Sequence, residues 1–262
     1  MLLVIDVGNT NIVLGVLDGP AVAHHWRIST MARTTDEMGL LFLQLLQFDG
    51  VAIDKLDGSI ISCVVPSVLY TIEKACRRYL GLESMVVGRG MRTGMRVRTD
   101  NPREVGADRI VNAVAALDEH PAPLIVVDFG TATTFDCVSA DGDYVGGAIA
   151  PGLRISADAL FERTAMLPRV ELEKPPKAIG TNTVRSMQSG LFWGYVGLVD
   201  GLARRCKEEV GGAPLCIATG GLANLVGRAC VEIDRVDEFL TLKGLRLLWE
   251  RNRTQKVEPR AT

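Results

Sequence analysis

The sequence carries one short pattern twice, once in each half of the chain. Residues 2–19 read LLVIDVGNTNIVLGVLDG, and residues 124–142 read LIVVDFGTATTFDCVSADG. Each copy has an apolar strand, an Asp-x-Gly turn, a second strand and a closing glycine. An internal repeat of this kind indicates duplicated supersecondary units. We therefore expect an α/β protein with two related lobes.

The lobe boundaries follow from the position of the second copy. Pro121 and Pro123 precede it and mark a break in the chain. We expect an N-terminal lobe over residues 1–120, a C-terminal lobe over residues 121–250 and a tail over residues 251–262.

Local patterns predict the elements within each lobe. The chain opens with three short apolar runs separated by turns, which predict an antiparallel meander. Thr34 and Glu37 have the spacing of a capping box at the start of a helix. Apolar residues at helical spacing predict further helices. These cover residues 66–80, 102–119, 183–210 and 241–250.

Composition limits the classes of partner. The chain has 262 residues with 29 basic and 31 acidic side chains, a net charge of −2. It lacks the excess of Lys and Arg on which nucleic-acid binding depends. The longest uncharged run, residues 210–227, contains Pro214 and several glycines and predicts no membrane helix. The six cysteines show no CxxC spacing, so we expect reduced thiols in the cytoplasm.

The first Asp-x-Gly turn has the residue types of a phosphate site. Asp6 ends a strand, Gly8 allows close approach of the backbone, and Asn9, Thr10 and Asn11 add neutral hydrogen-bonding groups. This set suits the terminal phosphates of a nucleotide, with Asp6 near the accompanying Mg²⁺. A simple β-turn has similar residues and is the alternative.

The second copy favours the phosphate interpretation. Asp128, Gly130 and Thr131 repeat the first turn, and two facing hairpins can hold a polyphosphate between them. Carboxylates meet phosphates favourably only through a cation, so the pair predicts bound cations. A third element, ATGG at residues 218–221, leads from a strand into a helix and can receive an adenine or a ribose on its backbone. An ordinary strand-to-helix turn is the alternative there.

The order of these three elements is similar to that of the actin-like ATPases, which include sugar kinases, heat-shock 70 chaperones and actin. The resemblance implies a duplicated ribonuclease-H-like fold, with a nucleotide cleft between two lobes. No GxxxxGK[ST] loop occurs, and no GxGxxG follows the first strand. P-loop and Rossmann interpretations are therefore weak.

The segment NPREVGADRIVN, residues 101–112, carries a candidate base. Asp108 falls in the first turn of an expected helix, where the helix dipole favours its ionised form. An ionised carboxylate near a γ-phosphate can accept the proton of an attacking hydroxyl. Arg109 can pair with an anionic substrate. A helix-start acid and a surface arginine are the alternatives.

Taken together, these segments resemble type III pantothenate kinases. The resemblance implies ATP-dependent phosphorylation of pantothenate to 4′-phosphopantothenate, the first step of coenzyme A biosynthesis, by a homodimer. The matching segments occur in the family's order and are DVGNTN (6–11), NPREVGADRIVNA (101–113), VVDFGTATTFD (126–136), GGAIAPGL (146–153), IGTNTVRSMQSG (179–190) and ATGGLA (218–223).

The resemblance also implies residue roles. Asp108 would be the proton acceptor, and Asp128 the ligand of a monovalent cation, K⁺ or NH₄⁺, while Mg²⁺ accompanies ATP. Thr183 would contact pantothenate across the dimer interface. The implied ATP-binding residues are Asp6, Val7, Gly8, Asn9, Thr10, Asn11, Ile12, Val13 and Thr131. The implied pantothenate-binding residues are Gly106, Ala107, Asp108, Arg109 and Thr183.

One position departs from the family. Many members have a tyrosine two residues before the Asn-Pro pair, where this chain has Thr99. We therefore do not count Thr99 among the expected site residues. Two other functions remain open: a kinase of another small alcohol, and an accessory or regulatory protein that binds nucleotide without turnover.

Overall fold

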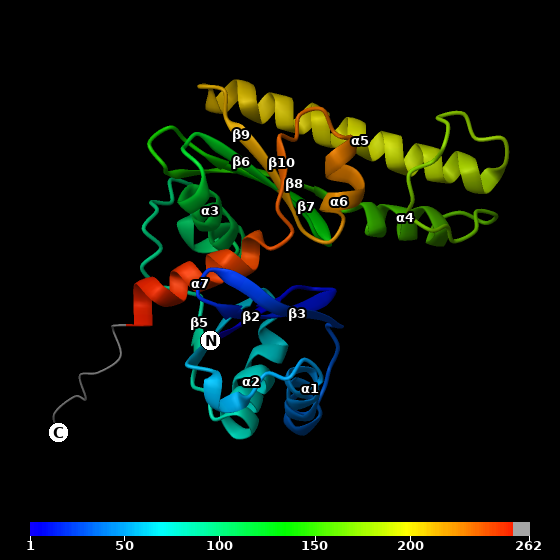
Figure 1. Ribbon diagram of the computed structural model, residues 1–262. Helices are drawn as coiled ribbons and strands as arrows, with labels where there is room; N and C mark the ends of the chain where they lie inside the picture. Colours follow the sequence, from blue (N-terminus) through cyan, green and yellow to red (C-terminus); the bar gives the residue numbers. More distant parts are fainter. Residues whose placement is uncertain (254–262) are drawn as a thin grey trace. The chain divides into compact units, whose positions relative to one another are not determined.

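The computed structural model describes residues 1–253, which form two compact α/β units (Figure 1). Of the described residues, the first unit contains Met1–Gly94, Arg103–Ala115 and residues 241–253. The second contains Met95–Pro102 and Ala116–Leu240. No helix in this described part is long and apolar enough to cross a membrane.

The first unit is built on a five-stranded sheet of order β3-β2-β1-β4-β5. The first three strands form the predicted antiparallel meander, and β4 and β5 add in parallel. The strands are β1 (Leu2–Val7), β2 (Asn11–Asp18), β3 (Ala21–Ser29), β4 (Gly58–Cys63) and β5 (Ser84–Val86).

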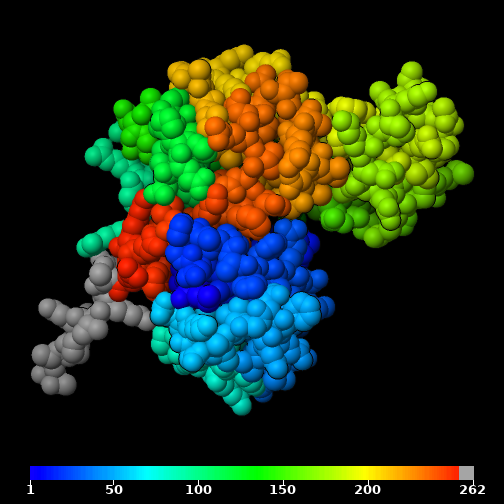
Figure 2. All heavy atoms as spheres, in the orientation of Figure 1, coloured from blue at the N-terminus to red at the C-terminus, as the bar shows by residue number. Residues whose placement is uncertain are grey.

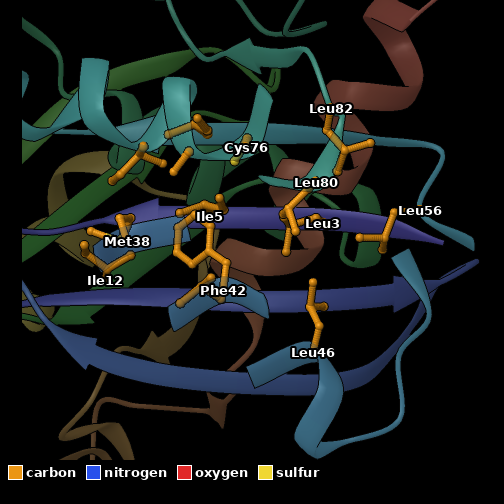
Figure 3. Close-up of a cluster of buried hydrophobic side chains, with 14 of the residues drawn as sticks. Leu3, Ile5, Ile12, Met38, Phe42, Leu46, Leu56, Cys76, Leu80 and Leu82 are labelled. Atoms are coloured by element: carbon orange, nitrogen blue, oxygen red, sulfur yellow. The ribbon is translucent and has the colours of Figure 1, made fainter. Parts of the chain in front are cut away.

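Helices α1 (Thr35–Phe48) and α2 (Pro66–Ala75) cover one face of this sheet. Leu3 and Ile5 alternate along β1 toward Met38 and Phe42 of α1, and all four are nearly fully buried (Figure 3). The predicted capping box is confirmed, because the Thr34 hydroxyl accepts a hydrogen bond from the Glu37 amide at 3.2 Å. These contacts anchor the meander that contains the first Asp-x-Gly turn.

The C-terminal helix α7 (Leu240–Asn252) packs on the other face of the same sheet. A Cβ on Gly15 of β2 would lie 2.9 Å from the Leu242 side chain, and a Cβ on Gly244 would lie 2.3 Å from the Val111 carbonyl of α3 (Ala107–Glu119). Glycines at these two positions thus allow α7 to approach both the sheet and α3.

The second unit repeats the arrangement with a sheet of order β10-β9-β6-β7-β8. Strand β6 pairs antiparallel with β7 and parallel with β9, as β1 does with β2 and β4. The strands are β6 (Leu124–Phe129), β7 (Ala132–Val138), β8 (Tyr144–Pro151), β9 (Leu215–Thr219) and β10 (Arg235–Val236). The duplication expected from the sequence is therefore present in the topology.

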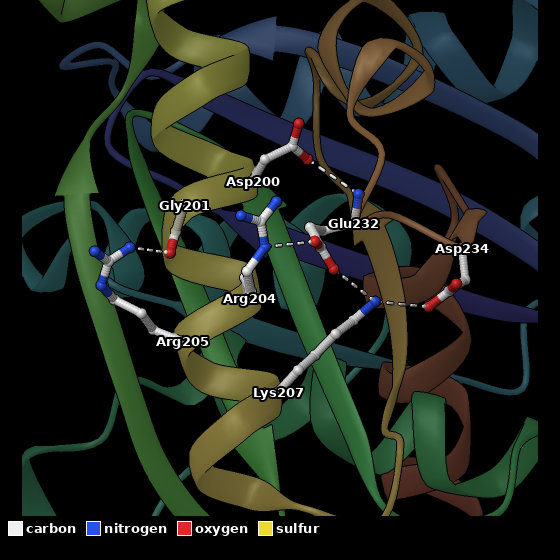
Figure 4. A network of polar contacts seen from close by, with 7 residues as sticks. All are labelled: Asp200, Gly201, Arg204, Arg205, Lys207, Glu232 and Asp234. Carbon is white, nitrogen blue, oxygen red and sulfur yellow. Dashed lines mark hydrogen bonds and ion pairs between the residues drawn. The ribbon is translucent and has the colours of Figure 1, made fainter.

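Helix α5 (Thr183–Val210) covers one face of the second sheet, and its bounds match the prediction. Its C-terminal half is tied to the segment before β10 by ion pairs (Figure 4). Glu232 accepts from Arg204 at 3.0 Å and lies 3.4 Å from the Lys207 ammonium. Asp234 in turn accepts the Cys216 amide of β9 at 2.7 Å. This network fixes the course of β9 toward the ATGG turn.

The remaining elements are an extension of the second unit and several short helices. Helix α4 (Leu153–Glu162), the loop after it and the first turns of α5 form an arm, defined here as residues 153–193. Figure 1 shows the arm extending beyond the second sheet. The short elements are η1 (Ile53–Lys55), η2 (Cys76–Leu80), η3 (Pro102–Glu104), α6 (Ala223–Val226) and η4 (Gly227–Ala229).

The units divide the chain differently from the predicted lobes. Residues 95–102 join the second unit because Val97 bridges to Tyr144 and the Arg98 amide donates to the Tyr144 carbonyl at 2.8 Å. Helix α7 returns to the first unit, although the prediction placed residues 241–250 in the C-terminal lobe. It also includes Arg251 and Asn252, which were assigned to the tail; residues 254–262 lie outside the described residues.

The helix predicted over residues 102–119 is interrupted. It forms the short η3, then two non-helical residues, and then α3 from Ala107. Gly106 lies at the break, immediately before the helix that carries Asp108. The break places Asp108 in the first turn of α3, as predicted.

Candidate active site

The first Asp-x-Gly turn is a tight, internally bonded hairpin. The Gly8 amide donates to the Asn11 carbonyl at 3.0 Å, and a Cβ on Gly8 would lie 3.2 Å from the same oxygen. Thr30, which follows β3, braces the turn, because its hydroxyl donates to the Gly8 carbonyl at 2.7 Å. Asn9 and Thr10 are the exposed residues of the turn.

The predicted ATP-binding residues of this hairpin differ in which of their groups are accessible to a ligand. The side chains of Val7 and Ile12 are fully buried in the core, so only their main chain can meet a ligand. Asn11 and Val13 are partly exposed. The Gly8 amide is engaged within the turn rather than directed to a phosphate. The hairpin therefore offers its exposed tip and the carboxylate of Asp6.

Asp6 lies among packed atoms at the end of β1. Burial, first, and the charge of Asp108 together raise the pKa of Asp6 to about 7, and the Ser62 hydroxyl opposes the rise. The first unit thus brings two of the predicted site residues, Asp6 and Asp108, into electrostatic contact. Two carboxylates in this situation repel each other, and a divalent cation relieves both the repulsion and the burial cost.

Asp108 is held at the start of α3 by its own helix. The Arg109 amide donates to Asp108 Oδ1 at 2.9 Å. A Cβ on Gly106 would lie 2.5 Å from the same carboxylate oxygen, so a larger residue there would displace the Asp108 side chain. Burial raises the pKa of the Asp108 carboxyl, while the Arg109 amide and the Arg109 charge lower it. The result is a partly desolvated carboxylate, which is a stronger base than one in water.

The predicted pantothenate-binding residues of this segment therefore form one local group. Gly106, Ala107, Asp108 and Arg109 are consecutive and all partly buried at the helix start. A carboxylate and a guanidinium side by side can serve an acceptor that carries both a hydroxyl and a negative charge.

The second hairpin, in the second unit, has a similar turn that is one residue shorter, because Val7 pairs with Ile12 but Phe129 pairs with Thr133. A Cβ on Gly130 would lie 3.2 Å from the Ala132 carbonyl, as one on Gly8 would from Asn11. The Thr131 carbonyl accepts the Gly152 amide at 3.1 Å, which joins the turn to the start of α4. Asp128 and Thr131 are partly exposed. The structure thus places both predicted residues on one turn.

The ATGG turn lies directly against Asp128. Asp128 and Thr219 are register partners on β6 and β9. Gly220, which follows, has φ of +90°, and a Cβ on it would lie 2.3 Å from Asp128 Oδ1. Only glycine fits this position, both for its backbone conformation and for the space that the carboxylate occupies.

Thr183 lies away from the second hairpin. It is the first residue of α5 and is exposed in the arm that Figure 1 shows beyond the sheet. The loop before it is packed tightly onto the helix start, because a Cβ on Gly180 would lie 2.3 Å from the Ser186 amide. Asn182 caps the helix by accepting the Arg185 amide at 2.9 Å.

Two residues beside the carboxylates were not predicted as site residues. Ser62 is the register partner of Asp6 on β4, and Thr219 is that of Asp128 on β9. The sequence signal is a hydroxyl residue near the end of a buried apolar strand, but the pairing requires knowledge of the register.

Thr99 stands where many family members have tyrosine, and it lies against β8. A Cβ on Gly146 would lie 3.8 Å from the Thr99 methyl group, which is ordinary van der Waals distance. The Thr99 hydroxyl is buried without a hydrogen-bond partner in the described part of the chain. Thr99 is therefore packed within the second unit.

A bound metal ion would not find a preformed cluster of side-chain ligands among the described residues. Within residues 1–253, no group of three or more His, Cys, Asp or Glu side chains is arranged to hold a metal ion. A cation at Asp6 or Asp128 would therefore share its coordination with other oxygens, such as hydroxyls or the phosphates of a nucleotide.

Solved structures of low sequence identity share the fold. The activator of the 2-hydroxyisocaproyl-CoA dehydratase from Clostridium difficile, solved with bound ADPNP, has a TM-score of 0.53 and 12% identity and covers 100% of this chain and 99% of its own. The ethanolamine utilization protein EutJ from Carboxydothermus hydrogenoformans has a TM-score of 0.55 and 16% identity and covers 94% and 89%. The actin-like fold class expected from the sequence is thereby confirmed.

Relatives of much higher identity extend over nearly the whole chain. The type III pantothenate kinase of Syntrophotalea carbinolica is 55% identical over 97% of this chain and 100% of its own length. That of Exiguobacterium sp. is 53% identical over 96% and 99%. The family model described as type III pantothenate kinase matches residues 2–205. The chain therefore belongs to the type III pantothenate kinase family.

Proposed function

We propose that this protein transfers the γ-phosphoryl group of ATP to the primary hydroxyl of pantothenate, giving 4′-phosphopantothenate in coenzyme A biosynthesis. The observation that carries the proposal is the pairing of Asp6 and Asp108 within one unit. It brings the first Asp-x-Gly turn, expected to bind phosphates, close to the start of α3, expected to bind the acceptor. The chain belongs to the family in which this combination is expected. The cytoplasm, where the described free cysteines stay reduced, is the proposed location.

The first Asp-x-Gly turn would supply nucleotide-binding groups in the first unit, and the second Asp-x-Gly turn and the ATGG turn would supply them in the second. The exposed tip at Asn9 and Thr10 and the partly exposed Thr131 would face the phosphates. Val7 and Ile12 would contribute through the main chain alone, since their side chains are buried. A solved structure that shares the fold carries bound ADPNP, which supports nucleotide binding by a protein of this fold.

The acceptor would be positioned by the start of α3. Arg109 would pair with the carboxylate of pantothenate, and Asp108 would take the proton of the attacking hydroxyl. Burial raises the pKa of Asp108, while the Arg109 amide and charge oppose the rise, so the carboxylate gains basicity. Because phosphoryl transfer has a loose transition state, positioning should contribute more to the rate than proton removal.

The carboxylates fit the cations that the reaction needs. Asp6, crowded by Asp108, suits Mg²⁺, and Asp128, beside a buried hydroxyl, suits a monovalent cation, K⁺ or NH₄⁺. Bound cations supply neutralisation of the phosphate charge. The protein's part is to hold Asp6 and Asp128 at the ends of two rigid strands.

We further propose a homodimer in which the arm meets a second copy. The arm exposes apolar side chains that a monomer gains nothing by presenting to water, including Met166 at 91% and Ile179 at 83% exposure. Ile155, Val184 and Trp193 continue this exposure along α4 and α5. Figure 2 shows the atoms of the arm in yellow-green. Thr183, in the same arm, would then contact the pantothenate of the partner copy.

The direct test is ADP formation from Mg-ATP, with and without pantothenate, in potassium and in sodium buffer. The proposal expects ADP only when pantothenate is present, with phosphopantothenate as co-product and a higher rate in potassium. ADP formation that depends on another alcohol instead of pantothenate would show that the other alcohol is the substrate. ATP binding without any turnover would favour the accessory or regulatory role.

A further inference from the structure

Each hairpin carboxylate has a hydroxyl beside it on the adjacent parallel strand. Asp6 pairs in register with Ser62, and Asp128 pairs in register with Thr219. Register partners on parallel strands point to the same face of the sheet, so each hydroxyl is directed to the side of its carboxylate. The duplication has therefore preserved a carboxylate–hydroxyl pair, not only a carboxylate.

These two hydroxyls are buried without a hydrogen-bond partner among the described residues. Ser62 is 0% and Thr219 1% exposed. The Ser62 hydroxyl lies close enough to lower the pKa of Asp6, but outside hydrogen-bond geometry. A buried hydroxyl left in this state is costly. The neighbouring Ser59 shows the usual outcome, because its hydroxyl pairs with that of Ser84 at 2.7 Å.

Asp128 is partly exposed, and two glycines lie close to its carboxylate. A Cβ on Gly220 would lie 2.3 Å from one carboxylate oxygen, Oδ1, and a Cβ on Gly130 would lie 3.8 Å from the same oxygen. Glycines on two different turns thus keep side chains away from this oxygen. Thr219, immediately before Gly220, is the register partner of Asp128, so its buried oxygen lies on the same face of the sheet.

We propose that Thr219 Oγ1 is a protein ligand, together with Asp128, of the monovalent cation assigned to Asp128 under the proposed function. A threonine hydroxyl has two lone pairs and one proton, so it can coordinate a cation while donating to a neighbouring carboxylate. One carboxylate and one neutral oxygen give a single negative charge, which matches a monovalent ion better than a divalent one. This role gives the buried hydroxyl the partner that the protein itself does not provide.

The test compares two substitutions at one position. Thr219→Val keeps the shape and removes the oxygen, and Thr219→Ser keeps the oxygen. Thermal unfolding of the nucleotide-free protein is followed in a series of KCl concentrations, with tetramethylammonium chloride holding the ionic strength constant. We expect the wild type and Thr219→Ser to be stabilised by K⁺. The K⁺ concentration for half-maximal stabilisation should rise at least tenfold in Thr219→Val.

A second comparison separates a ligand from a structural hydroxyl. In tetramethylammonium alone, Thr219→Val should unfold at the same temperature as the wild type or higher, because it loses an unpartnered polar group. Thr133→Val is the matched control: its hydroxyl is bonded to that of Tyr195 in the core, so it should unfold at a lower temperature in both salts. A Thr219→Val protein that is destabilised equally in both salts, or that keeps the full response to K⁺, overturns the proposal.

Failure of this inference and failure of the proposed function give different results. Pantothenate-dependent ADP formation by the wild type, combined with an unchanged K⁺ response in Thr219→Val, rejects the ligand and keeps the kinase. Absence of that ADP formation, combined with a K⁺ response that Thr219→Val loses, rejects the kinase and keeps the ligand. If K⁺ does not stabilise the wild type, the proposed role of Thr219 as a cation ligand is rejected, whatever the kinase assay shows.

Discussion

The charge of Asp108 raises the pKa of Asp6, so the carboxylate at the end of β1 and the one at the start of α3 act on each other within the first unit. These residues lie far apart in the sequence and belong to different motifs. Their proximity joins a turn and a helix start, each common by itself, into one candidate site, which we propose serves the phosphates and their cation. The first two predictions test each carboxylate in turn.

Replacing Asp6 should change the pH dependence of stability. Burial and Asp108 raise the folded-state pKa of Asp6 from 3.8 to about 7, so the folded protein binds the proton more tightly than the unfolded chain. The stabilisation is complete below pH 3.8 and is lost as the pH rises through about 7. In EDTA at pH 8, Asp6→Asn should therefore be more stable to unfolding, by roughly 1–3 kcal/mol.

The same substitution should show little gain near pH 4, where wild-type Asp6 is already protonated. It should also abolish stabilisation by Mg²⁺ and lower kinase activity. An equal gain in stability at both pH values would contradict the raised pKa. Thermal unfolding monitored by circular dichroism at the two pH values measures the difference.

Replacing Asp108 should affect turnover more than nucleotide binding. Asp108→Asn keeps the size of the side chain and removes its basicity, so kcat should fall by about 10²- to 10⁴-fold, the usual contribution of a general base. Binding of ATP, measured by calorimetry, should persist. Asp118→Asn is a suitable control, because Asp118 is exposed near the other end of the same helix. Full turnover in Asp108→Asn would refute the assignment.

Gly220 should tolerate no side chain. At φ of +90°, any other residue is strained, by roughly 1–2 kcal/mol, and a Cβ would meet Asp128 Oδ1 at 2.3 Å and the Phe129 amide at 2.8 Å. Gly220→Ala should therefore lower both stability and activity. The control is Gly197→Ala in α5, where a Cβ meets nothing within 4 Å and helix propensity favours alanine. Urea unfolding measures the loss of stability, and the kinase assay measures the loss of activity.

The ion pairs that hold the segment before β10 should be sensitive to acid. The hydrogen bond from Arg204 and the charge of Lys207 lower the pKa of Glu232 from 4.5. The stabilisation is therefore present above pH 4.5 and is lost as the pH falls through the lowered value.

Lys207→Met should remove two of these ion pairs, at a global cost of no more than about 1 kcal/mol because the pairs are near the surface. The larger effect should be faster hydrogen exchange in residues 230–236. Arg205→Met, which removes only a hydrogen bond to the Gly201 carbonyl, should leave that exchange unchanged. Equal exchange in the two variants would show that the network does not hold the segment.

Local sequence patterns predicted much of the fold. The Asp-x-Gly repeat predicted two related α/β lobes, and the structure has two sheets of equivalent topology; the Thr34 capping box and the bounds of α5 are also confirmed. Asp108 in a first helical turn is confirmed as well. These features depend on residues close together in the chain, where periodicity and capping chemistry can be recognised.

The features that the sequence did not predict depend on long-range contacts. The return of α7 to the first unit rests on the fit of Gly244 against Val111 and of Gly15 against Leu242. The pairing of Ser62 with Asp6 rests on the register of β1 and β4. Neither leaves a local pattern, because strand register and helix docking are decided by residues far apart in the chain.

The course of the chain has a consequence for its synthesis. Because α7 is a component of the first unit, that unit lacks its last helix until the ribosome has made nearly all of the second. The sheet face with Gly15 and Val4, which α7 covers, stays exposed during translation. A chain stopped after the second unit would lose part of the first, so nonsense mutations late in the gene should produce misfolded rather than merely shortened protein.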